Sequence, residues 1–156
     1  MRTAESVLLT CCPPGILPGA RVALFGANNE RMAAKPVIDS VPKDRCIDLV
    51  GKLDLLSTTA CLKRCAFYVG NDSGLMHMAA ATGVPTLGLF GPTREEWYAP
   101  WGEKSAVVRT EIPFIELFGE NLGQNFDHRT TGTLMDSLTV DMAEAASRDL
   151  WSKAHG

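Results

Sequence analysis

Two short segments in the middle of the chain are apolar at nearly every position, instead of at alternate positions. They are residues 66–70 (AFYVG) and residues 85–90 (PTLGLF). Strands with two apolar faces are typical of a parallel sheet that helices cover on both sides. The segment between them, SGLMHMAAAT, favours a helix that ends at Gly83, where a left-handed C-cap favours glycine. The order strand, helix, strand predicts an α/β fold with a Rossmann-like parallel sheet flanked by helices.

The same alternation extends toward the N-terminus. RVALFG (21–26) predicts a strand, and NNERMAAK after it reads as a helix with asparagine in the capping position, before a polar segment that contains Pro36 and Pro42. CIDLVG (46–51) is a second strand candidate. Asp54 is a candidate N-cap for a helix from about Leu55 to Cys65.

The sequence after residue 110 predicts fewer elements. Residues 111–133 have no steady periodicity and are expected to be mostly loop. Within 134–156, Thr139 is a candidate N-cap for an amphipathic helix that packs on the sheet, with one side made by Val140, Ala143, Ala146, Leu150 and Trp151. A chain of 156 residues fits one domain. We divide it into an incomplete start (1–20), a motif-bearing core (21–110) and these two regions.

Composition excludes several functions. Fifteen basic residues against 18 acidic residues give a net charge of −3 without a basic stripe, so we expect no nucleic-acid partner. The five cysteines form no CxxC pair, and we expect no metal site. Cys61 and Cys65 would share a helical face, where they are either buried thiols or metal ligands. No run of about eighteen apolar residues occurs, so we expect no membrane-spanning helix and a cytoplasmic protein.

The turn from residue 70 to residue 74 is the candidate ligand site. In parallel α/β sheets, ligands bind beyond the carboxyl ends of the strands, and this turn leads directly from such an end into a helix. The first N–H groups of that helix, from Ser73, Gly74 and Leu75, have no intrahelical acceptor and carry the positive end of the helix dipole. Gly74 allows close approach of an anion, and the Ser73 hydroxyl adds a donor. The turn therefore predicts a phosphate site.

Three neighbouring side chains complete this candidate site. Asp72 either caps the helix or faces sugar hydroxyls, because a carboxylate beside a phosphate is repulsive. His77, one turn into the helix, either reaches the same pocket or is a core histidine. Thr93, in Gly91-Pro92-Thr93, ends the next strand at the same edge and forms the opposite wall. The chain has no GxGxxG, P-loop or GxSxG motif.

These segments resemble a known enzyme family. The run YVGNDSGLMHMAAATGVPTLGLFGPT, with IDLVGKLDLL upstream and YAPWG downstream, is similar to the C-terminal domain of glycosyltransferase family 9, the heptosyltransferases of lipopolysaccharide core assembly. The resemblance covers residues 21–110, and LMDSLTVDMAEAA looks like the closing helix of the family. It implies the C-terminal half of a GT-B enzyme, which binds a nucleotide-sugar donor, typically ADP-heptose. The N-terminal half binds the lipid-linked acceptor.

The resemblance also implies roles for individual residues. Asp72, Ser73, Gly74 and His77 would contact the diphosphate and the sugar, with Thr93 in the donor-side loop. Three positions fall in the nucleoside part: Gly26, Glu30, which is placed like the acidic residue that holds the ribose, and Leu53, which would line the adenine. The transfer is expected to need no metal and no cofactor, and no catalytic residue is assigned.

The departures from the family pattern define the alternatives. The acceptor domain, with its proposed general base, has no counterpart in the sequence, and neither has the first strand of the donor domain. Residues 1–20 would begin partway through the helix that follows that strand. We therefore expect the chain alone to be inactive, as an excised fragment or a truncated product, and in the full-length enzyme to lie at the inner membrane.

The alternative is a non-catalytic α/β module whose exposed sheet edge pairs with another chain or a second copy. An epimerase-like domain is a third interpretation.

Overall fold

The structure is a computed structural model of the chain, and it describes residues 8–10, 19–91, 93–111 and 135–156. The expected loop of residues 111–133 lies, apart from residue 111, outside the described residues.

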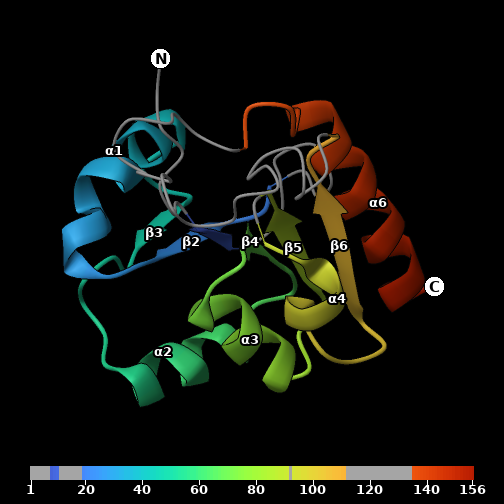
Figure 1. The fold of residues 1–156 in the computed structure, drawn as a ribbon. Helices are drawn as coiled ribbons and strands as arrows, with labels where there is room; N and C mark the ends of the chain where they lie inside the picture. The colour runs from blue at the N-terminus through green and yellow to red at the C-terminus, as the bar shows by residue number, and fades with distance from the viewer. Residues whose placement is uncertain (1–7, 11–18, 92, 112–134) are drawn as a thin grey trace, which may run out of the picture.

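A six-stranded sheet forms the centre of the molecule, in the order β3-β2-β1-β4-β5-β6 (Figure 1). Its strands are β1 (Leu8–Thr10), β2 (Val22–Phe25), β3 (Cys46–Asp48), β4 (Tyr68–Asn71), β5 (Thr86–Phe90) and β6 (Ser105–Arg109). Because β1 is antiparallel to both β2 and β4, these two strands run in the same direction, and β3, β5 and β6 are parallel to them. The predicted α/β fold with a parallel sheet is confirmed, and five carboxyl ends lie at one edge.

Strand β1 corrects the expectation for residues 1–20. In place of part of a helix, residues 8–10 form a strand between β2 and β4 and pair with both. The backbone N–H and C=O groups of two neighbouring central strands need partners, and a short extended segment supplies them in either direction. The unpaired edge that we expected at this position is therefore absent among the described strands. The sheet ends at β3 on one side and at β6 on the other.

Helices cover both faces of the sheet (Figure 1). The helical segments are the 3-10 turn η1 (Asn28–Glu30), α1 (Arg31–Ser40), α2 (Leu55–Leu62), α3 (Gly74–Ala81), α4 (Glu95–Tyr98) and α6 (Val140–His155). Helix α1 packs on Leu24 and α6 on Val69, which share one face because both are paired with Leu9. Helices α2 and α3 pack on the other face. None of the described helices is long and apolar enough to cross a membrane.

Three predicted helix caps are confirmed. The Ser57 amide donates to the Asp54 carboxylate at 2.8 Å, which starts α2. The Met142 amide donates to the Thr139 hydroxyl at 3.2 Å, which starts α6. Gly83 follows α3 with φ +80°, a left-handed conformation that glycine adopts without strain.

Other boundaries differ from the predictions. Helix α1 continues through Pro36 to Ser40, because proline removes only one hydrogen bond while Ala34 and its neighbours remain packed against β2. The capping position before η1 is occupied by Ala27 and not by an asparagine. Helix α2 ends at Leu62, earlier than Cys65. Strand β6 was not anticipated.

The expected apolar side of α6 is only partly correct. Val140 lies at the start of the helix and is 79% exposed, so it does not pack on the sheet. Leu150 is buried against Phe67, Val69 and Leu87, and Ala146 and Trp151 pack around them. The contact therefore comes from Ala146, Leu150 and Trp151 and not from the first turn of the helix.

A pair of glycines lies on the sheet face that carries α3. Gly70 of β4 and Gly88 of β5 are direct partners across the two parallel strands. A Cβ at Gly88 would lie 2.7 Å from the Met76 sulfur of α3, and a Cβ at Gly70 would lie 2.8 Å from Cζ of Tyr68. The absence of two side chains thus gives room to the Tyr68 ring and lets α3 approach the sheet closely.

An ion pair fixes the loop between β5 and α4. The Arg109 guanidinium, at the end of β6, binds the Glu95 carboxylate and donates to the Gly91 carbonyl at 3.4 Å. The hydrogen bond from Arg109 lowers the pKa of Glu95 below its ordinary value, against the opposing effect of partial burial. Gly91 and Glu95 are therefore both attached to the end of β6.

The Gly70–Tyr68 contact predicts the effect of a single methyl group. We expect Gly70→Ala to lower the free energy of unfolding by about 1–3 kcal/mol, because the buried Tyr68 ring would have to move. Gly74→Ala is the matched control: a Cβ there has nothing within 4 Å, so the change should be within about 0.5 kcal/mol or slightly stabilising. Urea unfolding of the two variants measures both values, and equal stability would refute the packing argument.

The Glu95–Arg109 pair predicts a dependence of stability on pH. A folded-state pKa below the ordinary value of 4.5 means that the pair stabilises the fold above that pH and ceases to do so as the pH falls through the folded-state value. Wild type should therefore be more stable than Glu95→Gln at pH 6, and the difference should shrink by pH 3. Glu96→Gln, on the same helix and exposed, is the control. A difference that stays constant in urea unfolding between pH 6 and pH 3 would contradict this prediction.

Candidate functional site

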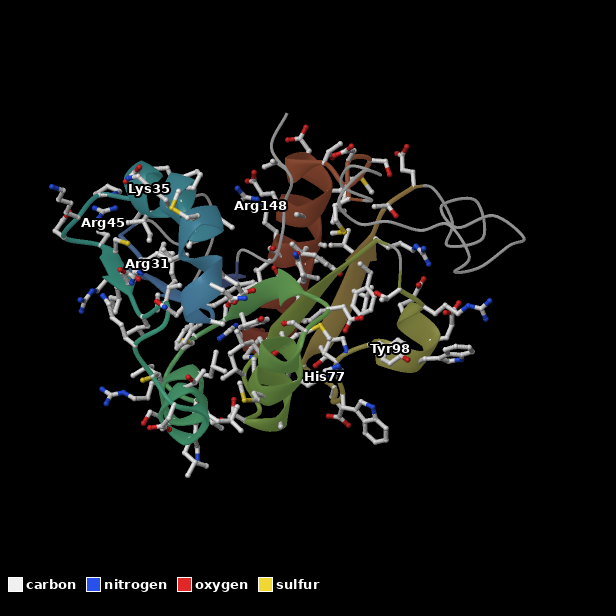
Figure 2. The ribbon with its side chains drawn as sticks, turned by 60° about the vertical axis from the view of Figure 1, so that its left-hand side comes forward. Arg31, Lys35, Arg45, His77, Tyr98 and Arg148 are labelled. Atoms are coloured by element: carbon white, nitrogen blue, oxygen red, sulfur yellow. The ribbon has the colours of Figure 1, made fainter. Side chains whose placement is uncertain are left out.

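The predicted site residues lie at the carboxyl edge of the sheet. Gly26 follows β2, residues 49–53 follow β3, and Asp72 to Gly74 follow β4. Thr93 follows β5 at the same edge. Figure 2 shows α3, which carries His77, beside α4, which carries Tyr98. The topology thus collects at one edge residues that are far apart in the sequence.

The N-terminus of α3 offers free amides. The first helical hydrogen bond runs from the His77 amide to the Ser73 carbonyl at 3.3 Å. In the part of the chain that the structure describes, the amides of Ser73, Gly74 and Leu75 donate to no acceptor. Gly74 is exposed, and a Cβ built on it would meet no atom within 4 Å. These amides, with the positive end of the helix dipole, can bind an anion.

The structure argues against capping by Asp72 and against a core position for His77. Ser73, and not Asp72, occupies the capping position, and no described amide donates to the Asp72 side chain. The Asp72 carboxylate lies 3.8 Å from Nε2 of His77. The His77 side chain is 44% exposed, so it is not a core histidine. The Asp72 carboxylate and the His77 imidazole therefore add two polar side chains near the free amides.

Tyr68 lies close to this candidate site, and the sequence reasoning gave it no role. Its side chain is fully buried on the α3 face of β4, and its ring passes over Gly70 toward the carboxyl end. Burial raises the pKa of the phenol well above its usual range, the Glu30 charge adds to this effect, and the nearby Ser73 hydroxyl opposes it. The Ser73 and Tyr68 oxygens are both buried, and neither has a partner of hydrogen-bond geometry among the described residues. The available signal was a tyrosine, with its polar hydroxyl, inside the apolar segment AFYVG.

Glu30 is fixed by the backbone at the end of β2. The Ala27 amide donates to the Glu30 carboxylate, which would lie 3.1 Å from a Cβ on Gly26. The Gly26 carbonyl accepts a hydrogen bond from the Gly51 amide at 2.9 Å, and this bond joins the ends of β2 and β3.

An ionic cluster that the sequence reasoning did not identify fixes the turn before Leu53. Arg31 and Lys52 bind the Asp48 carboxylate at 3.0 and 3.1 Å, and the Val50 amide donates to it at 3.1 Å. Burial raises the pKa of Asp48, but these three hydrogen bonds outweigh it and hold the pKa below its usual value. Leu53 itself is half-buried and packs against the α2–α3 core. Its apolar surface is only partly available to a ligand.

Two further candidates are placed as follows. Thr93 is half-buried, in the loop that Arg109 and Glu95 fix, and its hydroxyl has no hydrogen bond to a described residue. Cys61 and Cys65 are half-buried and pack against the same core as Leu53. Their position fits the interpretation as buried thiols.

Comparison with known proteins identifies relatives of this architecture. The chain is 34% identical over 97 residues to lipooligosaccharide heptosyltransferase 2 of Haemophilus influenzae, which covers 60% of this chain and 28% of that protein. It is 32% identical over 94 residues to lipopolysaccharide heptosyltransferase 2 of Escherichia coli, which covers 58% of this chain and 27% of that protein. The chain thus spans less than a third of the length of these curated relatives.

Solved structures share the fold. A structure of E. coli ADP-heptose LPS heptosyltransferase II superposes with a TM-score of 0.66 at 22% identity, over 87% of this chain and 38% of that one. The E. coli heptosyltransferase WaaC with ADP superposes with a TM-score of 0.53 at 29% identity, over 63% of this chain and 29% of that one. The sequence model of glycosyltransferase family 9 (heptosyltransferase) matches residues 17–120. This match covers about two thirds of the 156 residues, and the chain therefore belongs to glycosyltransferase family 9.

Proposed function

We propose that this chain is the donor-binding, C-terminal half of an inverting GT-B glycosyltransferase of lipopolysaccharide core synthesis. The donor is a nucleotide-diphosphate sugar, with ADP-heptose as the first candidate. The observation that carries the proposal is the N-terminus of α3, where three unpaired amides meet an open position at Gly74. The relative WaaC was solved with ADP, which supports a nucleoside diphosphate as the ligand class.

The diphosphate binds at the start of α3. The amides of Ser73, Gly74 and Leu75 donate to phosphate oxygens, and the Ser73 hydroxyl adds a fourth donor. These donors stabilise the charge that develops on the leaving diphosphate when the sugar is transferred. Such stabilisation requires no metal ion, so we propose a metal-independent transfer.

The sugar and the nucleoside occupy the two sides of this centre. Asp72 accepts hydrogen bonds from sugar hydroxyls, and His77, 3.8 Å away, orients the carboxylate or contacts the diphosphate. Thr93 contributes its hydroxyl from the opposite loop. On the other side, Glu30 beside Gly26 binds the ribose hydroxyls, and Leu53 gives apolar contact to the base.

Catalysis requires groups that we assign to none of the described residues. An inverting transfer needs a base for the acceptor hydroxyl and a surface for a lipid-linked acceptor. We propose that a second half of the enzyme supplies both, and that the present chain binds the donor without transferring its sugar.

The anion site at α3 predicts the effect of a branched side chain. Gly74→Val should weaken ADP binding by at least about tenfold, because the valine methyl groups occupy the position where a phosphate approaches the amides. Chemical-shift changes of the amides of residues 73–77 during an ADP titration measure the affinity.

Matched controls separate binding from folding. A Cβ at Gly74 has free space, so the variant should unfold at the same urea concentration as wild type within error. Ser152→Val places the same side chain on the exposed surface of α6, across the sheet from α3, and should leave the ADP titration unchanged. If Gly74→Val binds ADP like wild type, the phosphate does not bind at this helix.

A further inference from the structure

Two buried hydroxyls near the α3 N-terminus have no hydrogen-bond partner among the described residues. The Tyr68 side chain is 0% exposed, yet its oxygen has no hydrogen-bond partner among the described residues. The oxygen of Ser73, the residue that precedes α3, is buried and equally without a partner. The two groups are close enough for Ser73 to influence Tyr68, although they do not reach hydrogen-bond geometry in this state.

A buried hydroxyl without a partner destabilises a protein, and native structures contain few of them. Phenylalanine would fill the same space over Gly70 without this cost. Ser73 lies next to the amides that bind the phosphate in the proposed function. A phosphate bound at the start of α3 would bring a hydrogen-bond acceptor to the Ser73 hydroxyl. The two unpartnered hydroxyls of Tyr68 and Ser73 are therefore candidates for ligand binding and not only parts of the core.

We propose that Tyr68 is a positioning residue of the donor site, acting through Ser73 on a phosphate group of the ligand. When the ligand binds, the phenol donates its hydrogen to Oγ of Ser73. The serine hydroxyl hydrogen is then directed toward a phosphate oxygen at the start of α3. This inference rests on the proposed function and adds to it a residue to which the sequence analysis gave no role in the site.

The chemistry of the neighbourhood fits an acceptor and not a donor as the ligand group. The amides of Gly74 and Leu75 are donors, and the Ser73 hydroxyl becomes one when its oxygen accepts from Tyr68. Burial and the Glu30 carboxylate both keep the phenol protonated, so Tyr68 remains a donor. A phosphate oxygen carries only lone pairs and can accept from all of these groups, whereas a sugar hydroxyl would bring a hydrogen of its own.

Gly70 is the structural condition for this arrangement. A Cβ at residue 70 would collide with the hydroxyl end of the tyrosine ring. With glycine, the ring extends from residue 68 over residue 70, so that its hydroxyl lies two residues closer to the carboxyl edge than its own Cα.

The test is a double-mutant cycle on the whole chain with ADP as the probe. Tyr68→Phe and Ser73→Ala should each weaken ADP binding by about three- to tenfold, the size expected for one lost hydrogen bond. The double variant should bind no more weakly than Ser73→Ala alone, because Tyr68 acts only through the serine hydroxyl. Tyr98→Phe, the only other tyrosine and 49% exposed on α4, is the control and should bind ADP like wild type.

A second measurement separates positioning from a structural role. Without ADP, Tyr68→Phe should unfold at or above the wild-type temperature, since it removes an unsatisfied hydroxyl. A marked loss of stability would mean that the hydroxyl is already bonded in the free protein and would overturn the inference.

The outcomes also distinguish this inference from the proposed function. If wild type binds ADP and Tyr68→Phe binds it equally well, only the role of Tyr68 is wrong. Additive losses in the double variant would likewise show that Tyr68 does not act through Ser73. If wild type does not respond to millimolar ADP, the proposed function fails and the inference fails with it.

Discussion

The close approach of α3 to the sheet determines where the candidate site can form. Gly70 and Gly88 are paired across β4 and β5, and neither has a side chain between the sheet and the helix. Met76 and the Tyr68 ring occupy the space that two Cβ atoms would take. The N-terminus of α3 is thereby fixed at the carboxyl edge, with its free amides pointing out of the sheet.

Two ionic clusters attach the flanking loops to the same edge. Arg31 and Lys52 hold Asp48 at the end of β3, and Arg109 holds Glu95 beyond β5. Both carboxylates have lowered pKa values because their hydrogen bonds outweigh the effect of burial. The loops on either side of α3 are thus held by ion pairs that involve none of the proposed ligand contacts.

The reversed strand β1 leaves this edge intact. It pairs antiparallel with β2 and β4, but the other five strands remain parallel to one another. Their carboxyl ends therefore still meet, and the fold superposes on heptosyltransferase structures over most of this chain. Because the chain covers less than half of those structures, the likeness concerns this part of the family architecture.

The sequence by itself determined the fold class, the existence of the seven helices and strands between residues 21 and 90 (β2, α1, β3, α2, β4, α3 and β5), the caps at Asp54, Gly83 and Thr139, and the turn at Gly74. Each of these follows from local patterns: apolar strands, side-chain caps and glycine conformations. Only the tertiary structure decided that residues 8–10 complete the sheet, that the Tyr68 ring lies over Gly70, and that Asp48 and Arg109 anchor the loops. These features depend on contacts between residues that are distant in the sequence, or on the direction of a side chain along its strand. Local sequence patterns reveal neither these long-range contacts nor these side-chain directions.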